Sequence, residues 1–527
     1  MENISMNTDV LVIGGNLTGD GMAVKIADAG YRVLLAKHDI DPAGQPEALL
    51  GASDETLAEW RKVANQAASH KNIELLDKSN VTRVAGVCGD FSVRLVVGDG
   101  DVQEKKVGAI VVATDLTTCP QHDAYGIALS DNTLSLSQAE TRIAEGQITG
   151  ENVGFLVGLK QNSDPITMKR IFKAVLAIVE GGGSASVYVD DLKLADNGLD
   201  RLYKEGRDKG AVYFKMKEAP VVNGTNVVFH DMVLGKPVES NHDLLVIEEK
   251  NHTDAANVSL AEILGLHITP SGFLQKDNVH RFPAKSNRKG IFVTGGARQI
   301  QNITGCVADI ASVVLELGGL FSAEVPVDRI AVVDREKCAI CLTCYRCCPH
   351  GAIYWDDKAV VSPVACQGCG ICASECPNDA IQLMSFTDDE ISGKIKEALQ
   401  KTPGAIIAFC CENSSAEAAE AAARFGMPLP ENLEIINVPC AGKVDIQYIL
   451  SAFVEGAGGV LVAACHNGNC KSEFGSNYAK WRINEVARML DETGIDKNRL
   501  AFVTMAANMA NDFVKAAGTL AGKIAGK

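Results

Sequence analysis

Short apolar runs alternate with amphipathic stretches along most of the chain, which is the pattern of α/β domains. Residues 9–13 form a continuous apolar run, a glycine-rich turn and a helical stretch to Gly30 follow, and a second apolar run begins at Tyr31. This order of strand, turn, helix and strand predicts the opening of a dinucleotide-binding unit. Further strands are predicted over 81–98 and 106–114.

Two more α/β segments follow. From about Asn152 strands alternate with a helix predicted over 166–180, and this segment ends near Glu249. A later strand at 290–296 ends in a glycine turn like that of the first segment. The last segment, 404–527, has four apolar runs separated by helical stretches, which predicts a parallel sheet with covering helices.

A string of four cysteines occurs twice, 28 residues apart, and each copy is written C-x2-C-x2-C-x3-C-P. Bacterial ferredoxins hold [4Fe–4S] clusters with this spacing, and the fourth cysteine of each run belongs to the other cluster. The predicted ligand sets are Cys338, Cys341, Cys344 and Cys376 for cluster one, and Cys366, Cys369, Cys372 and Cys348 for cluster two. Zinc or disulfides are the alternatives, although zinc sites rarely use a third cysteine followed by proline.

The turn GGNLTG fits the dinucleotide-binding pattern only in part. Gly14 and Gly19 stand at the first and third glycine positions, with Gly15 beside them, and Asn16 stands at the second. The next strand runs into Lys37, where an acidic residue would bind a ribose. The turn still offers N–H groups to a phosphate, and Lys37 either suits a phosphate or is solvated. A scaffold domain that has lost its flavin is the alternative.

Charge and composition exclude several classes of function. The net charge of −16 argues against nucleic-acid binding, and 527 residues predict three or four domains. The N-terminus has no basic segment followed by an apolar stretch, and no run of 18 apolar residues occurs, so we expect neither a signal peptide nor a membrane span. Seventeen cysteines are best explained by metal binding in a reducing cytoplasm.

Five further cysteines lie in the last quarter of the chain, at or just after the ends of predicted strands. Ligands of an open parallel sheet bind outside the carboxyl ends of its strands, so cysteines there indicate a binding site. Buried thiols that act as small hydrophobic side chains are the alternative. That alternative is our interpretation for the four remaining cysteines, Cys88, Cys119, Cys306 and Cys347.

Residues 8–320 resemble the FAD domain of the A-type subunit of heterodisulfide reductase, which belongs to the thioredoxin-reductase-like flavoproteins. The resemblance rests on the first glycine turn and on the strands at 107–114 and 290–297. It implies a two-part FAD domain. The implied cofactor contacts are Gly14, Gly15, Asn16, Gly19, Lys37, Thr114, Gly295, Gly296 and Gln299.

Asn16 and Lys37 depart from the adenosine-binding pattern, and two features of the second α/β segment change what we expect of it. The family's cysteine-bearing stretch is replaced by 165–172, which has no cysteine, so its extra cluster is expected to be missing. The segment also lacks a glycine fingerprint of its own, and we therefore expect no direct binding of NAD(P)H.

The last segment resembles the delta subunit of methyl-viologen-reducing hydrogenase, a [2Fe–2S] electron-transfer module. The matching stretches are 438–445, 463–470 and 475–482. Where that family usually has CxxC, this chain has Cys411 and then Ser414. The implied ligands are Cys411, Cys440, Cys465 and Cys470, with Cys410 as a substitute. His466 is either a further ligand or a solvated histidine of the loop, and the second alternative is favoured.

The combination of these parts resembles the B-type subunit of the quinone-interacting membrane-bound oxidoreductase of sulfate reducers. A flavin exchanges electron pairs and iron–sulfur clusters exchange single electrons, so the array converts one into the other. The resemblance implies FAD, two [4Fe–4S] clusters and a [2Fe–2S] cluster in an electron-transfer oxidoreductase subunit. It also implies partners: a second flavoprotein, a membrane quinone or haem subunit, and adenylylsulfate reductase in sulfate respiration. The location would be the cytoplasmic face of the membrane, held by partner subunits.

Two other functions stay open from the sequence. One is a subunit of a soluble, electron-bifurcating complex of the heterodisulfide reductase type with hydrogenase or formate dehydrogenase. The other is a flavin-free structural relay subunit. In each case the expected domain ranges are 1–125 with 250–325 for the Rossmann-like domain, 126–249 for the second α/β domain, 328–386 for the ferredoxin domain, and 400–527 for the C-terminal domain.

Overall fold

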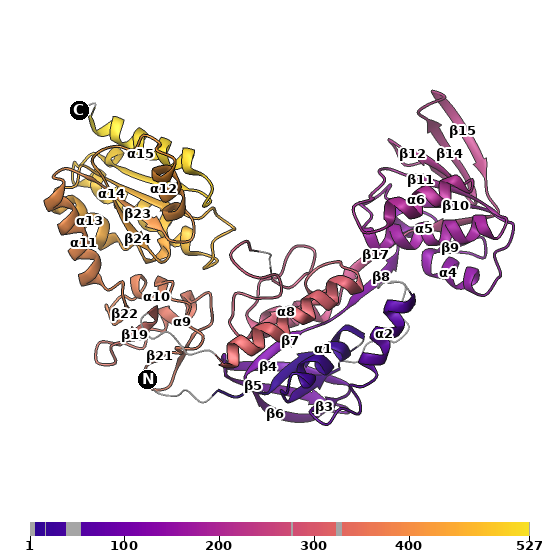
Figure 1. The fold of residues 1–527 in the computed structure, drawn as a ribbon, viewed down its shortest axis with the longest axis horizontal. Coiled ribbons are helices and arrows are strands. Elements are labelled where there is room, and N and C mark those ends of the chain that lie inside the picture. Colours follow the sequence, from indigo (N-terminus) through magenta and orange to yellow (C-terminus); the bar gives the residue numbers. More distant parts are fainter. Residues whose placement is uncertain (1–5, 16, 38–53, 276–277, 323–328, 526–527) are drawn as a thin grey trace.

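The computed structural model describes residues 6–15, 17–37, 54–275, 278–322 and 329–525. It contains three sheets of parallel strands and a small domain of short antiparallel strands (Figure 1). The α/β multidomain fold predicted from the sequence is therefore confirmed.

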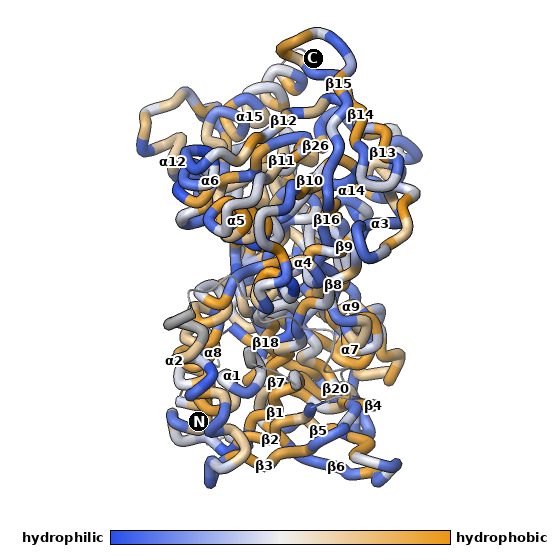
Figure 2. The backbone as a smooth tube through the Cα atoms, turned by 90° about the vertical axis from the view of Figure 1, so that its right-hand side faces the viewer, coloured by the Kyte–Doolittle hydropathy of each residue, from blue (hydrophilic) through white to orange (hydrophobic). Residues whose placement is uncertain are grey.

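The first sheet has the strand order β18-β7-β1-β2-β3, with all neighbouring strands parallel. Every residue of β1 and β7 is buried, as expected for a parallel sheet covered on both faces, and Figure 2 shows hydrophobic stretches along both strands. Because β18 follows the second domain in the chain, two separate segments build this first domain. The bounds are β1 Val10–Ile13, α1 Leu17–Asp28, β2 Val33–Ala36, α2 Asp54–Ala64, β3 Ile73–Leu76, β7 Ala109–Val112, β18 Ile291–Val293 and α8 Ile303–Ser322.

The single strand predicted over 81–98 is wrong, because the chain turns at Cys88 and Gly89 and forms a hairpin. Gly89 has a φ of +87°, a conformation that residues with a side chain rarely adopt. The hairpin belongs to an antiparallel sheet of three strands beside the first sheet. Its bounds are β4 Ser79–Val87, β5 Asp90–Val97 and β6 Asp101–Val107.

The second domain has a parallel sheet in the order β12-β11-β10-β16-β9 and is joined to the first by the antiparallel ribbon β8-β17. In Figure 1 it lies at the opposite end of the first domain from the ferredoxin domain. The bounds are β8 Leu116–Pro120, α3 His122–Tyr125, β9 Thr133–Ser135, α4 Leu136–Ala144, β10 Asn152–Val157, α5 Pro165–Glu180, β11 Ser184–Val189, α6 Leu199–Asp208, β12 Val212–Lys215, β13 Val221–Asn223, β14 Asn226–Asp231, β15 Lys236–Asn241, β16 Leu244–Ile247, β17 Glu249–Thr253 and α7 Ala256–Leu264.

Helix α8 is, within the described part of the chain, the one helix whose length and apolar composition would allow it to cross a membrane. This is weak support for a span, because a core helix of a soluble domain has the same properties. Here α8 packs against α1, and Tyr31 contacts Phe321 with ring centroids 5.2 Å apart. The helix therefore covers the first sheet.

The ferredoxin domain pairs β19 with β22 and β20 with β21, and each cysteine run contains a short helix that carries its third cysteine. The bounds are β19 Ala331–Val333, α9 Thr343–Cys347, β20 Ile353–Trp355, β21 Ala359–Val361, α10 Ile371–Ser374, β22 Ile381–Leu383 and the linking helix α11 Asp388–Lys401. Thr387 and Glu390 form a capping box that fixes where α11 begins.

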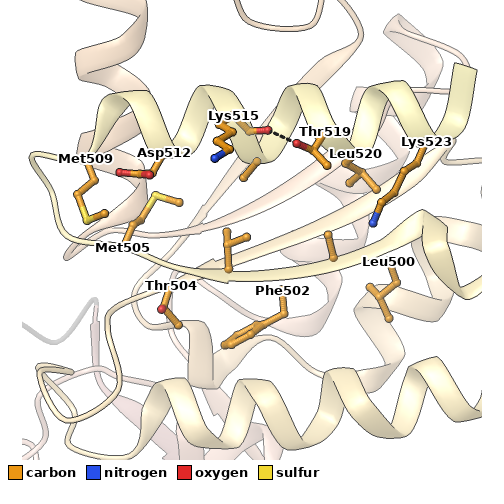
Figure 3. A pocket seen from close by; sticks show the side chains of 13 residues that line it. Leu500, Phe502, Thr504, Met505, Met509, Asp512, Lys515, Thr519, Leu520 and Lys523 are labelled. Atoms are coloured by element: carbon orange, nitrogen blue, oxygen red, sulfur yellow. Dashed lines mark hydrogen bonds between the residues drawn. The ribbon is translucent and has the colours of Figure 1, made fainter.

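The C-terminal domain has four parallel strands in the order β24-β23-β25-β26, as the apolar runs predicted. A cavity of about 580 Å³ lies between the edge strand β26 and helix α15, and none of the cysteines lines it (Figure 3). The bounds are β23 Ile406–Cys411, α12 Ser415–Arg424, β24 Leu433–Val438, α13 Ile446–Val454, β25 Gly459–Ala464, α14 Gly475–Glu492, β26 Leu500–Thr504 and α15 Ala510–Ala525.

Candidate functional site

The glycine turn after β1 packs too closely for side chains. A Cβ on Gly14 would lie 2.4 Å from the carbonyl oxygen of Ala113, and one on Gly19 would lie 3.0 Å from the carbonyl carbon of Gly14. The turn therefore presents backbone groups at the carboxyl edge of the sheet, where dinucleotides bind in this fold. Gly15 is partly exposed there, and Asn16 lies outside the described residues.

The turn after β18 meets the same edge from the other side. A Cβ on Gly295 would lie 3.0 Å from Cγ2 of Thr18, and one on Gly296 would lie 2.6 Å from the backbone of Asp115. The ends of β1, β7 and β18 thus converge, as a shared dinucleotide site requires. Two other predicted contacts point to protein neighbours: the Thr114 hydroxyl donates to Asn257 at 2.7 Å, and the Gln299 amide donates to Gln301 at 3.0 Å.

Lys37 is partly buried and forms an ion pair. Its Nζ lies 2.7 Å from a carboxylate oxygen of Asp20 on α1. Burial raises the pKa of the Asp20 carboxyl, and Lys37 opposes that rise. The sequence has no acidic residue at the end of β2. In the structure the carboxylate of Asp20, from α1, lies beside Lys37 at that position.

The phosphate-binding position of the second domain is occupied by the protein's own carboxylates. Asp164 caps α5 by accepting the N–H groups of Ile166 at 2.9 Å and Thr167 at 3.0 Å. Glu248 accepts the N–H of Gly158, at the end of β10, at 2.9 Å, and burial raises the pKa of the Glu248 carboxyl to about 7. A dinucleotide phosphate at this position would need these same donors.

The two ferredoxin runs have matching backbone geometry. Positive φ angles occur at Ile340 and Leu342 in the first run and at Gly368 and Gly370 in the second. Each pair occupies equivalent positions in the 28-residue repeat. The left-handed residues turn the chain so that successive cysteines face one centre, and the first run adopts this conformation without glycine.

Two buried cysteines have electrostatic neighbours from both runs, which is compatible with the crossed sets that the spacing predicts. Burial raises the pKa of the Cys344 thiol, and the nearby thiols that raise it further are Cys341, Cys376 and Cys338. Burial also raises the pKa of the Cys372 thiol, whose thiol neighbours are Cys369, Cys348, Cys347 and Cys366. Bound iron would offset this cost by favouring the thiolates, and the donor set fits two [4Fe–4S] clusters.

The two crossing cysteines receive equivalent hydrogen bonds. The N–H of Ala352 donates to Cys348 Sγ at 3.5 Å, and the N–H of Ala380 donates to Cys376 Sγ at 3.3 Å. Both alanines belong to the repeated C-P-x-x-A ending. Such N–H groups stabilise thiolate ligands and influence cluster potentials.

Four buried thiols of the C-terminal domain lie close together, and we call them the thiol ring: Cys411, Cys440, Cys465 and Cys470. A Cβ on Gly475 would lie 2.3 Å from Cys440 Sγ and 3.3 Å from Cys470 Sγ. The Cys411 and Cys465 sulfurs are 3.7 Å apart. Among the described residues no group of histidine, cysteine, aspartate or glutamate is arranged around a single metal ion. Four convergent thiols fit the donor set of a [2Fe–2S] cluster.

Cys410 cannot substitute for Cys411. Successive residues of a strand point to opposite faces, and Cys410 is buried with Ile406 and Ala408 on the face away from the thiol ring. His466 also points away from the ring, since its ring nitrogens lie 3.2 Å from the Thr504 hydroxyl and from the Met509 sulfur.

The three candidate centres do not have equal access to solvent. Cys341 is the exposed cysteine among the eight ferredoxin thiols, and Ile340 beside it is 49% exposed. Tyr345 and Trp355 are also exposed, with ring centroids 5.0 Å apart. Cluster one therefore lies at the surface, whereas the thiols of the thiol ring are all buried.

A loop of the first domain, residues 278–288, contacts the other two centres. The Asn278 amide donates to the carbonyl of Cys470 at 2.8 Å, and the Asn287 amide donates to the carbonyl of Pro349 at 2.6 Å. His350, next to Pro349, is buried, and its Nδ1 lies 3.0 Å from the carbonyl oxygen of Asn287. A cavity of about 580 Å³ lies between this loop and residues 467–469.

Two buried cations connect the ferredoxin domain to the C-terminal domain. Lys443 is 1% exposed and pairs with Asp388 at 3.0 Å, and Arg482 pairs with Glu375. Arg482 also donates to the carbonyl of Gly442 at 2.8 Å. Both cations hold the turn after Cys440 against cluster two. Sequence reasoning did not single them out, although they lie in the matching stretches 438–445 and 475–482, because their ion-pair partners Asp388 and Glu375 lie outside the C-terminal segment.

Comparisons with known proteins agree with this arrangement. Residues 406–526 match the family model of the methyl-viologen-reducing hydrogenase delta subunit, and residues 359–382 match a 4Fe–4S binding domain. The A-type subunit of the ferredoxin:CoB-CoM heterodisulfide reductase of Methanosarcina mazei is 24% identical, with 96% of this chain and 79% of the relative aligned. The iron-sulfur D component of the F420-non-reducing hydrogenase vhu of Methanocaldococcus jannaschii is 37% identical over 23% of this chain and 89% of its own length.

The chain is a protein like the A-type subunit of heterodisulfide reductase, with a C-terminal domain of the hydrogenase delta type. This heterodisulfide-reductase-like protein is an electron-transfer oxidoreductase subunit with iron–sulfur clusters, and its relatives and dinucleotide-binding fold support FAD as its flavin. Among solved structures, a thioredoxin reductase of T. acidophilum aligns with 59% of this chain and 98% of its own, at 15% identity and a TM-score of 0.40. Subunits of this kind work in multisubunit complexes.

Proposed function

We propose that this protein transfers electrons between a membrane quinone-linked partner and a soluble oxidoreductase, with adenylylsulfate reductase as the soluble partner in sulfate respiration. The observation that carries the proposal is that one loop of the first domain contacts both inner centres, through Asn278 to the Cys470 carbonyl and Asn287 to the Pro349 carbonyl, whereas Cys341 of cluster one is exposed. In such an array the buried centres would store and transfer electrons within the protein, and cluster one would exchange electrons with a partner at the surface.

The position of the cysteines supports a linear route. No cysteine occurs between Cys119 and Cys306, so the second domain supplies no thiolate for a cluster. A flavin that bifurcates electrons needs two separate routes away from it, and this chain supplies ligands for one. The flavin would exchange electron pairs, and the clusters would carry the electrons singly.

The partners define the location we propose. The chain would be held at the inner face of the membrane by a quinone- or haem-binding subunit, together with a second flavoprotein. The basis is the combination of the heterodisulfide-reductase-like part with the delta-type domain in one chain, without cysteines in the second domain.

The test is purification of the native complex from membranes through a tag on this chain. We expect a membrane subunit to co-purify and a quinol analogue to reduce the iron–sulfur signals. Addition of adenylylsulfate reductase together with adenylylsulfate, which accepts the electrons, should then reoxidise them. Reduction by hydrogenase or formate dehydrogenase with no response to quinol would overturn the proposal.

A second candidate is a soluble complex of the heterodisulfide reductase type with hydrogenase or formate dehydrogenase. The similarity of nearly the whole chain to the M. mazei heterodisulfide reductase protein favours it. A third, a flavin-free relay, is favoured by the ion pair between Lys37 and Asp20 at the adenosine position. Release of FAD on denaturation of the purified protein would exclude the third candidate.

A further inference from the structure

The turn that joins β14 to β15 in the second domain exposes three successive large apolar side chains. Met232 is 47%, Val233 94% and Leu234 60% exposed. We call residues 232–235 the apolar tip, and in Figure 1 the hairpin that carries it projects beyond the rest of the second domain. Exposed apolar side chains are usually scattered singly, so three in a row at a projecting turn indicate a contact site for a partner or a membrane.

We propose that the apolar tip inserts into the surface of a lipid bilayer and gives this chain a direct membrane contact. The contact is with the membrane surface, and no part of the chain needs to span the bilayer. The inference goes beyond the proposed function, because binding to lipid requires neither electron transfer nor a partner subunit.

The backbone of the apolar tip suits an apolar environment, because its N–H groups are bound within the turn. The Asp231 carboxylate accepts the N–H groups of Val233 and Leu234, each at 2.8 Å. The carbonyl oxygen of Asp231 accepts the N–H of Gly235 at 2.9 Å. An N–H group that lost its water without such a partner would oppose insertion. Insertion therefore leaves these three donors satisfied.

The charged residues at the base of the tip match the geometry of a membrane surface. Asp231 and Lys236 are cross-strand partners at the ends of β14 and β15, and Lys236 is exposed. Two residues on each strand separate this pair from the top of the turn, or roughly 7 Å. Membrane-surface elements bury their apolar face about 5–10 Å into the boundary between headgroups and acyl chains. The apolar side chains would thus reach the acyl chains while the charged pair stays among the headgroups.

Two features favour a bilayer over a protein as the partner of the tip. Protein interfaces usually include hydrogen bonds across the contact, and the N–H groups of residues 233–235 are already bound within the turn. Strand pairing with another chain is hindered as well, because β15 is an edge strand that carries Pro237 and the exposed Glu239. Acyl chains require no hydrogen bond, so the tip fits a lipid surface better.

The net charge of the chain determines which lipids the tip would bind. A net charge of −16 opposes attachment to an anionic membrane, so the contact must come from apolar insertion. Few inserted side chains give weak and reversible binding, and stable attachment takes a second signal. We therefore expect reversible binding of this chain to neutral lipid.

The experiment measures binding of the purified full-length protein to neutral phosphatidylcholine vesicles by flotation. Val233→Asp introduces a charge at the most exposed side chain of the tip. We expect this variant to partition into vesicles about tenfold less than the wild-type protein, because a buried valine is replaced by a charge. Binding of the wild-type protein should not fall when the salt concentration is raised, since charge attraction does not drive it.

Val454→Asp is the matched control, because Val454 is 85% exposed at the end of α13 in the C-terminal domain. It introduces the same charge and should leave binding to vesicles unchanged. Val233→Trp reports insertion directly. On binding, its fluorescence should shift to shorter wavelength and be quenched by brominated phosphatidylcholine more strongly than the fluorescence of the wild-type protein.

Four results would each overturn the inference: no binding of the wild-type protein to neutral vesicles, binding to anionic vesicles alone, an equal loss in Val454→Asp, or no additional quenching in Val233→Trp. Self-association that Val233→Asp abolishes, without binding to vesicles, would show that the tip contacts a second copy of the chain instead. Failure of the proposed function looks different, because a protein that quinol does not reduce could still bind vesicles through the tip.

Discussion

Gly475 offers a sharp test of the thiol ring, because the ring leaves no room for a side chain there. Gly475 is the first residue of α14, and its backbone is not in the left-handed region, so alanine suits its conformation. Only space is limiting. A Cβ at this position would lie 2.3 Å from Cys440 Sγ and 3.3 Å from Cys470 Sγ.

The size of the perturbation follows from these distances. Non-bonded heavy atoms settle at about 3.5–4.0 Å, so Cys440 Sγ would have to move by roughly 1 Å or more. Metal–ligand distances tolerate about 0.2 Å. Gly475→Ala should therefore remove Cys440 from the ligand set, and overpacking should lower the free energy of unfolding by about 1–3 kcal/mol.

The assay is iron and sulfide analysis together with electron paramagnetic resonance of the reduced protein. We expect loss of the [2Fe–2S] signal, with both [4Fe–4S] signals kept. The control is Gly522→Ala in α15, where a Cβ meets no atom within 4 Å and alanine should stabilise the helix by about 0.5–1 kcal/mol. A Gly475→Ala protein with a full [2Fe–2S] signal would refute our placement of the centre.

Three other substitutions test separate parts of the structure. Cys411→Ser should abolish the [2Fe–2S] signal and Cys410→Ser should keep it, because the two thiols lie on opposite faces of β23; equal loss in both would contradict this. The Glu248 carboxyl has a pKa of 4.5 in the unfolded chain and about 7 in the native protein. Between these pH values the native state binds more protons than the unfolded state. The free energy of unfolding therefore falls as pH rises, by up to about 3 kcal/mol. Glu248→Gln should remove that fall in thermal unfolding at about pH 5 and about pH 8, whereas an unchanged slope would assign it to another group. Arg482→Met leaves Glu375 without its cation and should cost about 3 kcal/mol, seen as faster hydrogen exchange at 440–444; unchanged exchange would show that Lys443 alone holds the interface.

Local patterns predicted the fold well where they were long and regular. The apolar runs of the C-terminal segment became four parallel strands, and the helix predicted over 166–180 is α5. The stretch 81–98 failed because its apolar pattern continues across Gly89, where the chain reverses. A glycine between two apolar runs is the signal that would have found this turn.

In the candidate site, too, local sequence patterns identified some of the residues, whereas others are apparent only from the tertiary structure. Cysteine spacing predicts two crossed ferredoxin sets, and these stay a prediction. The sequence left Cys410 open as a substitute for Cys411, and the structure decides against it, because the two side chains lie on opposite faces of β23. The roles of Lys443 and Arg482 could not be found, because they depend on how segments distant in sequence pack together. Asp20 is a similar case, since its pairing with Lys37 crosses from α1 to the end of β2.

The crossed grouping of the ferredoxin thiols has a consequence for biosynthesis. In the predicted grouping Cys376 goes with the first run and Cys348 with the second, so each set of four draws on both halves of the repeat. A nascent chain that ends before Cys376 would have three thiols for cluster one, and cluster two would need Cys372 as well as Cys348. With these sets we expect that neither half is loaded as an independent unit and that both centres mature only after the ribosome has passed the second run.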